Sequence, residues 1–362
     1  MKSTLRLCRH AAAGLALFAF GTLPAVAAEQ SPALKELIAA ANKEGKVNLS
    51  WGAKQLGGNA GVKEITDQMN AMFGTKIVPR FTPAPNENEN LNAILIAKNV
   101  NRPSQTDIFL GSNQHGALIA KNKLGTEVDW QALLPGRIQA SSVEANGAAI
   151  RMYTVLPGGI IYNTQRAPSV PTNLTDLLKP EWKGKIASTP YASGFDLLSS
   201  KDVWGEERTL DFARKLSAQI SGLMRCNEFE RVASGEFAAY ALDCTGTDWQ
   251  EWVKKGMPIG HVIPDDFAAV RYNYMTVPVN AVNPHAAELL ITFLHTPEGQ
   301  KFIWNERYAD LHTYEDGQMA KEIDEHKKRG VVFHEFTIDW YTAHPEIRES
   351  AAKVVKIMST GR

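Results

Sequence analysis

Residues 171–189 read PTNLTDLLKPEWKGKIAST, and this stretch decides the fold class. Pro171 favours the start of a helix, the leucines within 174–178 share one helical face, and Pro180 ends the helix. The run 186–189 then predicts a strand. Taken alone, these signals also fit an ordinary surface connection. Together they predict a short helix that leads directly into a strand.

The segment before this stretch alternates strands with helices. Its apolar patterns predict strands over 47–51, 76–81 and 107–110 and helices over 62–73 and 91–98. This alternation is typical of a mostly parallel sheet that is covered by helices on both faces. Ligands of such sheets collect at the carboxyl ends of the strands.

The alternation resumes farther along the chain. Strands are predicted over 186–189, 220–224, 237–242 and 272–279, and helices over 210–216, 249–253 and 346–358. Asn283-Pro284 and Thr296-Pro297 predict two further helix starts, the second with Thr296 as N-cap. The segment 149–162 is rich in Val, Ile, Tyr and Met, and we expect it to cross between two globular parts.

Two groups of residues resemble a known family. Tyr162-Asn163-Thr164, followed by residues 171–186, resembles the start of the second lobe in periplasmic solute-binding proteins of bacterial ABC importers. Residues 283–287 (NPHAA) and 296–300 (TPEGQ) resemble the return segment of the same proteins. The resemblance covers about 47–304 and points to the ferric-iron, spermidine and phosphonate-like branch of the type 2 periplasmic-binding-protein superfamily.

The resemblance implies an α/β fold of two Rossmann-like lobes, joined by crossing hinge strands, with the ligand cleft between the lobes. The domain boundaries that we predict are a signal peptide over 1–28, a first lobe over 29–152 and 277–310, a second lobe over 153–276, and a C-terminal helical tail over 311–362 that packs on the lobes.

The first 28 residues have the pattern of a secretory signal. Lys2, Arg6 and Arg9 precede an apolar run over 11–20, and small residues end at Ala28, the expected cleavage site. The apolar run is too short to span a bilayer, and no later segment has ~20 uninterrupted apolar residues. We therefore expect a soluble periplasmic protein.

The net charge of the chain limits the classes of molecule that it is expected to bind. The full sequence has 39 Lys and Arg and 39 Asp and Glu, and the signal removes three basic residues and no acidic one. The remaining 334 residues carry a formal charge of −3, which argues against a nucleic-acid partner. Their length favours two domains.

Cys226 and Cys244 are the cysteines that remain after the signal. In an oxidising periplasm, cysteines 18 positions apart either close a disulfide worth on the order of 3 kcal/mol or stay as buried thiols. The sequence leaves both options open because it does not give the distance between the Cα atoms.

Strand ends of the first lobe supply one set of candidate ligand contacts. They are Trp51 and Gly52 after the first strand and Ser112 and Asn113 after the third. Trp51 either stacks on a planar or cationic part of the solute or belongs to the core.

The second lobe supplies another set. Ser193 and Gly194 follow a strand and let backbone amides approach an anion or a carbonyl. Thr245 is either a ligand contact or a helix cap. Arg225 follows the strand 220–224, and its guanidinium either grips a carboxylate or phosphonate or pairs with a neighbouring acidic residue, Asp243 or Glu228.

Tyr272 and Tyr274 are separated by Asn273, so in a strand both point to the same face. Ferric-ion binders of the resembling superfamily use two adjacent tyrosines, and that pair is absent here. Fe(III) is a hard cation that also requires several anionic oxygen ligands, and the sequence does not identify such a set. We therefore interpret the two tyrosines as contacts of an organic ligand or as hinge packing, and we predict no metal site.

The sequence has no His-Glu-x-x-His, Gly-x-Ser-x-Gly or Walker motif. It predicts a monomeric receptor that needs no cofactor, binds a small organic anion or other small polar solute, and delivers it to a membrane permease driven by a separate ATPase. Three alternatives stay open: a ferric-ion-binding protein of the same class, a periplasmic enzyme on a two-lobed fold, and a receptor that reports to a membrane kinase.

Overall fold

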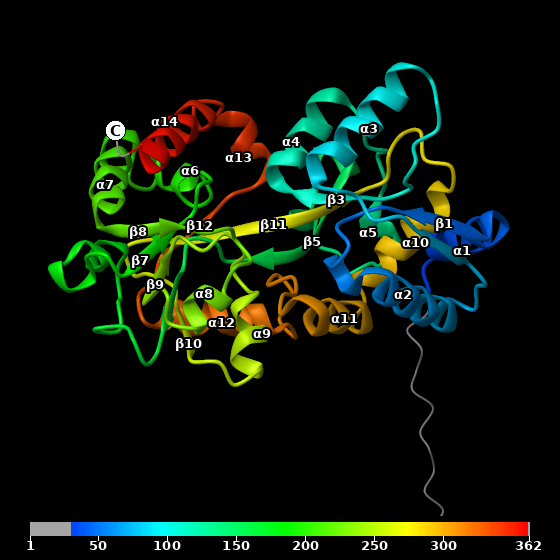
Figure 1. The fold of residues 1–362 in the computed structure, drawn as a ribbon. Helices are drawn as coiled ribbons and strands as arrows, with labels where there is room; N and C mark the ends of the chain where they lie inside the picture. The colour runs from blue at the N-terminus through cyan, green and yellow to red at the C-terminus, as the bar shows by residue number, and fades with distance from the viewer. Residues whose placement is uncertain (1–29, 361–362) are drawn as a thin grey trace, which may run out of the picture. The chain divides into compact units, whose positions relative to one another are not determined.

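The computed structural model describes residues 30–360, and the chain from Ser31 onward forms one compact unit. The predicted signal peptide lies outside the described residues. The helices are α1 (Pro32–Glu44), α2 (Gly58–Phe73), α3 (Glu87–Asn99), α4 (Asn113–Asn122), α5 (Trp130–Leu133), α6 (Phe195–Leu198), α7 (Glu206–Gln219), α8 (Glu230–Ala233), α9 (Trp249–Lys254), α10 (Pro284–Leu294), α11 (Pro297–Arg307), α12 (Gln318–Lys328), α13 (Ile338–Ala343) and α14 (Ile347–Thr360) (Figure 1).

The strands divide into a two-stranded sheet and two five-stranded sheets. They are β1 (Lys46–Leu49), β2 (Val78–Phe81), β3 (Phe109–Ser112), β4 (Val143–Glu144), β5 (Ala149–Val155), β6 (Ile160–Asn163), β7 (Ile186–Ser188), β8 (Ile220–Leu223), β9 (Ala239–Ala241), β10 (Ile259–Val262), β11 (Ala268–Thr276) and β12 (Phe333–Glu335). Short 3₁₀ helices lie at Gln55–Gly57, Ala140–Ser142, Ala145–Gly147, Leu174–Leu178 and Pro180–Trp182.

The first lobe is built on β1, β2 and β3. β1 pairs in parallel with β2, and Leu49 forms a parallel bridge with Ile108 just before β3. Helix α2 packs on this layer because Val62, Ile65 and Met69 recur on one face, and all three are buried. Helices α1 and α10 join the same core.

The second lobe is built on a sheet with the order β10-β6-β9-β7-β8. The stretch at 171–189 forms its entry. Asn173 and Asp176 form a capping box at the start of the 3₁₀ helix Leu174–Leu178, whose Leu174 and Leu177 are buried, and β7 follows. The prediction of a short helix that leads into a strand is confirmed.

Other predicted elements are also confirmed. Thr296 accepts a hydrogen bond from the backbone N–H of Gly299 and caps α11, with Pro297 in the first turn. The predicted last helix is α14. The strand predicted over 272–279 begins earlier than expected and spans Ala268–Thr276.

The prediction of a mostly parallel sheet is wrong for several strands. β11 is antiparallel to β5 and β3, and β6 is antiparallel to β9 and β10. Successive βα units keep their strands parallel, as in β1 with β2 and β7 with β8. The strand that brings the chain back from the second lobe, however, must run against the strand that carried it out.

The strands β5 and β11 connect the two lobes (Figure 1). Arg271 pairs with Val155 and Asn273 with Tyr153, whereas Tyr274 pairs with Arg151, so Met152 is an extra residue in β5. Paired residues lie on the same face of a sheet, and an extra residue reverses the side on which its neighbours point. The bulge therefore separates Tyr153 from Arg151.

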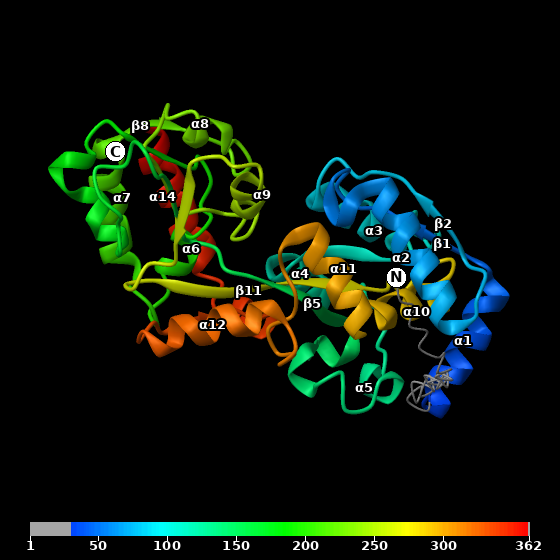
Figure 2. The same cartoon turned by 90° about the horizontal axis from the view of Figure 1, so that it is seen from below.

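One face of the β5–β11 pair carries Tyr153, Arg271 and Asn273, and we call it the cleft face. The other face carries Arg151, Tyr272 and Tyr274. This second face is covered by the C-terminal segment, because Tyr272 and Tyr274 share a buried cluster with residues of α12. Figure 2 shows α12 on one side of β11 and helices α3 and α9 on the other.

The C-terminal segment contacts both lobes. β12 pairs in parallel with the start of β11, α13 packs on α4 of the first lobe, and α14 packs on α6 and α7 of the second. Within residues 30–360, no helix is both long enough and apolar enough to cross a membrane.

Candidate functional site

The strand ends of the first lobe form a small pocket of about 380 Å³, lined by Gly52, Gln55, Asn86, Glu87, Asn88 and His115. His115 is held here because its Nδ1 lies 3.0 Å from both Ser112 Oγ and Glu87 Oε2, and its Nε2 lies 3.1 Å from Asn88 Oδ1. Burial alone would raise the pKa of Glu87, but the hydrogen bond and the charge of His115 hold it below its usual value.

The strand ends of the second lobe form a tight set of turns. Asp243, two residues after β9, accepts hydrogen bonds from the backbone N–H groups of Thr245 and Gly246. Gly246 has a φ of +74°, and a Cβ there would lie 2.7 Å from the backbone nitrogen of Leu156, so the turn closes on the end of β5. Burial raises the pKa of Asp243 to about 6.

A pocket of about 360 Å³ takes its walls from both lobes. Its lining comprises Lys54, Asn227, Phe229, Asp248, Glu251, Trp252, Lys255, Glu306, Arg307 and Tyr308. Arg307, the last residue of α11, lies 3.1 Å from Asp248, which precedes α9 in the second lobe. This ion pair links the two lobes across the pocket.

Tyr153 on the cleft face interacts with residues that line both pockets. Tyr153 is buried and forms a hydrogen bond with Arg307, and the charges of Glu87 and Asp248 also act on it. Burial, reinforced by the two carboxylates, raises the pKa of Tyr153 to about 12. The phenol is therefore neutral at pH 7 and can donate a hydrogen bond.

Arg271 is the arginine of the cleft face. Its Nη2 lies 3.5 Å from the carbonyl oxygen of Cys244, and its charge acts on Asp196 and on the hydroxyl of Tyr341. The Nε atoms of Arg271 and Arg307 are both buried, and neither has a hydrogen-bond partner within the described part of the chain. Such unpaired buried donors are unusual in proteins.

Some residues predicted from the sequence lie at these turns. Gly52 lines the first pocket, and Ser112 contacts its histidine. In the second lobe, Gly194 (φ +83°) packs beside Leu242 and Gly158, and Thr245 donates its hydroxyl to Asp243 instead of capping α9. Ser193 is half-buried next to Gly194.

Other predicted residues have different surroundings. Trp51 is buried in the core of the first lobe, where its Nε1 donates to the carbonyl of Gln55. The amide of Asn113 is buried and donates to the carbonyl of Phe336. Arg225 is exposed, and its backbone N–H, not its guanidinium, binds Glu228.

Tyr272 and Tyr274 lie on the face away from the cleft. Their hydroxyls donate to Glu335 and Glu144, at 2.7 Å each. Burial and these carboxylates raise the pKa of both tyrosines. This environment opposes the phenolate form that a ferric ion needs, and no cluster of His, Cys, Asp or Glu that could hold a metal is found among residues 30–360.

The structure joins Cys226 and Cys244 in a disulfide, with their Cα atoms 5.6 Å apart. Cys226 follows β8 and Cys244 follows β9, and these strands flank β7 in the sheet. The bond therefore fixes two strand-end loops of the second lobe, one of which carries Asn227 of the shared pocket.

Sequence reasoning did not identify Tyr153, Glu87, Arg271 or Arg307 as candidate site residues. The sequence carries one usable signal, because Arg271 and Asn273 alternate with Tyr272 and Tyr274 and must occupy the opposite face of the strand. For Tyr153 and Arg307 no comparable signal exists, since a bulge and the end of a distant helix bring them together.

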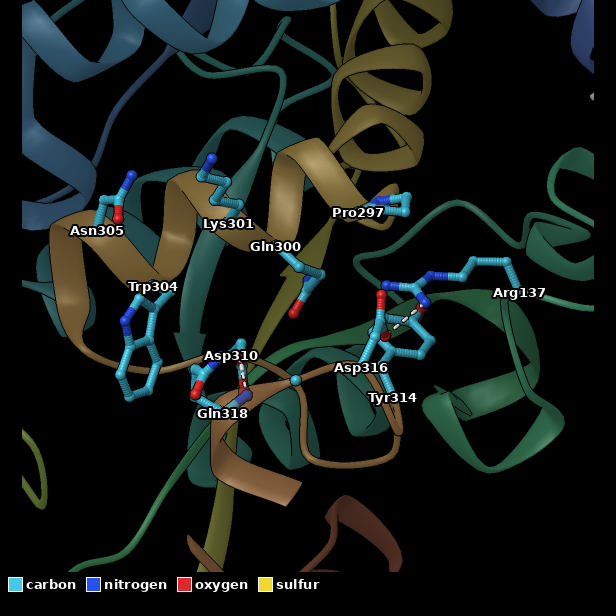
Figure 3. A pocket seen from close by; sticks show the side chains of 11 residues that line it. Arg137, Pro297, Gln300, Lys301, Trp304, Asn305, Asp310, Tyr314, Asp316 and Gln318 are labelled. Atoms are coloured by element: carbon cyan, nitrogen blue, oxygen red, sulfur yellow. Dashed lines mark hydrogen bonds and ion pairs between the residues drawn. The ribbon is translucent and has the colours of Figure 1, made fainter. Parts of the chain in front are cut away.

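A third pocket, of about 310 Å³, lies beside α11 (Figure 3). Arg137 lines this pocket, and its guanidinium group lies 2.8 Å from Asp316 and stacks 3.7 Å above the ring of Tyr314. The remaining lining comes from α11 and residues 310–318, so a molecule here would not touch the second-lobe strand ends. We therefore place the candidate solute site in the pocket that both lobes line, next to the cleft face of β5 and β11.

Comparison with known proteins defines the class. Residues 96–329 match the family model for bacterial extracellular solute-binding proteins, which is more than half of the chain. The chain therefore belongs to this family, whose members are transport components and not enzymes. A search of curated protein sequences found no match.

Solved structures show the same fold. The periplasmic binding protein AfuA from Actinobacillus pleuropneumoniae has a TM-score of 0.65 at 18% identity, covering 87% of this chain and 99% of that protein. The spermidine/putrescine-binding protein PotD from Streptococcus pneumoniae has a TM-score of 0.58 at 17% identity, covering 86% and 99%. Apo ferric ion-binding protein A from Pasteurella haemolytica has a TM-score of 0.61 at 14% identity, covering 88% and 98%.

These similarities place the chain on the type 2 periplasmic-binding-protein fold, and the predicted fold class is confirmed. The protein is a bacterial extracellular solute-binding protein.

Proposed function

We propose that the protein captures a small organic anion in the periplasm and delivers it to an ABC permease that is driven by a separate ATPase. The observation that carries this proposal concerns two arginines: Arg307, which lines the shared pocket, and Arg271 on the crossing strand β11 each have a buried Nε without a partner within the described residues. A carboxylate, phosphonate or phosphate group accepts such donors in bidentate geometry. Tyr153, on the same strand pair as Arg271 and in contact with Arg307, adds a neutral hydroxyl group.

Closure of the two lobes supplies the transport signal in this proposal. Arg271 lies on a crossing strand, Arg307 on the first lobe, and Asp248 with Asn227 on the second. A solute that contacts all of them binds most tightly when the lobes are closed, so it shifts the population toward closure. The lobe boundaries 29–152 with 277–310 and 153–276 belong to this proposal, as does a monomeric state.

Structural neighbours are consistent with an anionic solute but do not define it. AfuA was solved with fructose-6-phosphate, whereas others are described as spermidine/putrescine or iron binders. The fold thus accepts solutes of opposite charge, and only the side chains of this cleft discriminate between them.

A binding screen tests the proposal. The signal-free protein is heated with carboxylates, phosphonates, sugar phosphates, polyamines and ferric citrate, because a ligand at 100 times its Kd adds about 2.7 kcal/mol of stability. We expect the anions to stabilise it. With the best anion, Arg307→Met and Arg271→Met should each weaken binding at least about tenfold in calorimetry, since each removes a charged hydrogen-bond donor.

Arg208→Met is the matched control, because Arg208 stacks on Trp204 outside the cleft and should leave the affinity unchanged. Stabilisation by polyamines or ferric citrate alone would contradict the proposal. So would full affinity in both cleft variants.

A further inference from the structure

The pocket shared by the two lobes is balanced in charge. Three of its lining residues are basic (Lys54, Lys255 and Arg307) and three are acidic (Asp248, Glu251 and Glu306). A cleft that attracts a purely anionic solute is expected to carry an excess of positive charge, because the summed field of the lining raises the local concentration of the solute. The balance here indicates a solute with groups of both signs.

The arginine that faces this pocket already has an acidic partner. Arg307 lies 3.1 Å from Asp248, and the two side chains are only 22% and 29% exposed. An anion that binds Arg307 must therefore share it with Asp248 or displace it. Either arrangement places two negative groups close together in a half-buried site, which is unfavourable unless a positive group comes with the anion.

A second carboxylate acts on Arg307 from the first lobe. Glu87 stands at the start of α3 and lines the neighbouring pocket, with its charge maintained by His115 at 3.0 Å, and this charge acts on both Tyr153 and Arg307. Arg307 is thus paired with Asp248 of the second lobe and is also under the influence of Glu87 of the first. A positively charged group of the solute beside Arg307 would be attracted by the carboxylates of both Asp248 and Glu87.

We infer that the solute is zwitterionic, with its anionic group on Arg307 and Arg271 and an ammonium group against Asp248 and Glu87. This inference rests on the proposed function and narrows its substrate class from organic anions to amino-substituted ones. Asp248 thereby determines specificity: it pairs with Arg307 in the protein and with the solute amine in the complex. A solute without the amine leaves this carboxylate facing a second anion.

Matched pairs of compounds test the inference. Each pair has the same anionic group and chain length and differs only in the amine: 4-aminobutyrate with butyrate, 3-aminopropylphosphonate with propylphosphonate, and 2-aminoethyl phosphate with ethyl phosphate. Thermal shift ranks the pairs, and calorimetry measures the strongest. We expect the amino member to bind at least about tenfold more tightly, as a charge-assisted hydrogen bond in a half-buried site would provide.

The variant Asp248→Asn should remove this preference while leaving the fold intact, because the Asp248 side chain makes no capping hydrogen bond to α9. Binding of the amine-free member should stay the same or improve. Glu87→Gln should reduce the preference in the same direction. Asp211→Asn is the control, since Asp211 pairs with Lys215 on the surface of α7 and its loss should leave the preference unchanged.

The outcomes separate the two proposals. Equal or tighter binding of the amine-free anions, or a preference that survives in Asp248→Asn, would overturn the zwitterion inference and leave anion capture standing. If neither member of any pair binds, or if a diamine binds more tightly than all of them, anion capture fails and the zwitterion inference fails with it.

Discussion

His261 is one of three imidazoles, with His295 and His312, that we expect to make the protein sensitive to acid. His261 lies in the second lobe, stacked on Trp249 with ring centroids 4.8 Å apart, and its Nε2 has no partner within residues 30–360. Burial, together with the charge of His326, lowers the pKa of His261 from 6.5 to about 3. The folded protein therefore holds this residue neutral at pH values where the unfolded chain protonates it.

The sign of the pH effect follows directly. Between about pH 6.5 and 3 the unfolded state binds one more proton at His261 than the folded state, so the free energy of unfolding falls as the pH falls, by at most about 1.4 kcal/mol per pH unit. His261→Phe removes this contribution and keeps the ring stack. Urea unfolding at pH 7, 6, 5 and 4.5 should show a flatter pH dependence for the variant.

Asp243 acts in the opposite direction, because its raised pKa of about 6 makes the folded state gain stability as the pH falls from 6 toward 3.8. The contribution of Asp243 is the same in the wild type and in His261→Phe, so it cancels when their pH dependences are compared. Parallel curves for wild type and His261→Phe would show that His261 is not held neutral by the fold.

At the scale of elements, the disulfide connects the loop after β8 to the turn after β9. Asn227 and Asp248, which line the shared pocket, lie close to its two ends in the sequence. The bond therefore orders part of the cleft wall and does not merely tie two distant surface loops.

We expect the double variant Cys226→Ser/Cys244→Ser to lose about 3 kcal/mol of stability, because the cross-link that closes an 18-residue separation restricts the unfolded chain. Solute affinity should fall as well, since the wall must be ordered on binding. Urea unfolding with and without reductant gives the measurement. Reductant should shift the midpoint of the wild type and not that of the variant; an equal shift in both would count against a structural bond.

At the scale of the whole molecule, Arg151 holds the crossing strands and the C-terminal segment together. It pairs with Glu144 at 2.7 Å and with Glu335 at 2.8 Å, and it stacks 4.0 Å from the ring of Tyr272. Glu144 also accepts a hydrogen bond from the backbone N–H of Ile338 at the start of α13. β4, β5, β11, β12 and α13 thus meet at one cluster of charged side chains, of which Arg151 and Glu144 are buried.

Arg151→Met should destabilise the protein by about 3–5 kcal/mol, because it leaves Glu144, whose side chain is only 6% exposed, without its cation. Because the cluster joins the crossing strands to the C-terminal segment, we also expect the decrease in the radius of gyration on solute binding to change. Chemical unfolding and small-angle scattering measure the two effects. Lys215→Met, which breaks an exposed pair on α7, should behave like wild type, and similar results for both variants would contradict a role for the cluster.

Most elements of this fold were predictable from local patterns. The helix face of Val62, Ile65 and Met69, the Thr296 cap and the Leu174–Leu178 turn each depend on residues within a few positions of one another. Short-range spacing and capping preferences determine such structures with little help from the rest of the chain. The class of the protein followed from two such segments taken in order.

The side chains that meet in the cleft were decided by tertiary structure alone. The extra residue Met152 turns Tyr153 to the cleft and Arg151 to the C-terminal segment, and no local pattern marks that bulge. Arg307 meets Asp248 although 59 positions separate them, because α11 and α9 belong to different lobes. Sequence alone determined which elements form; their packing decided which charges face the solute, since that depends on contacts between residues far apart in the chain.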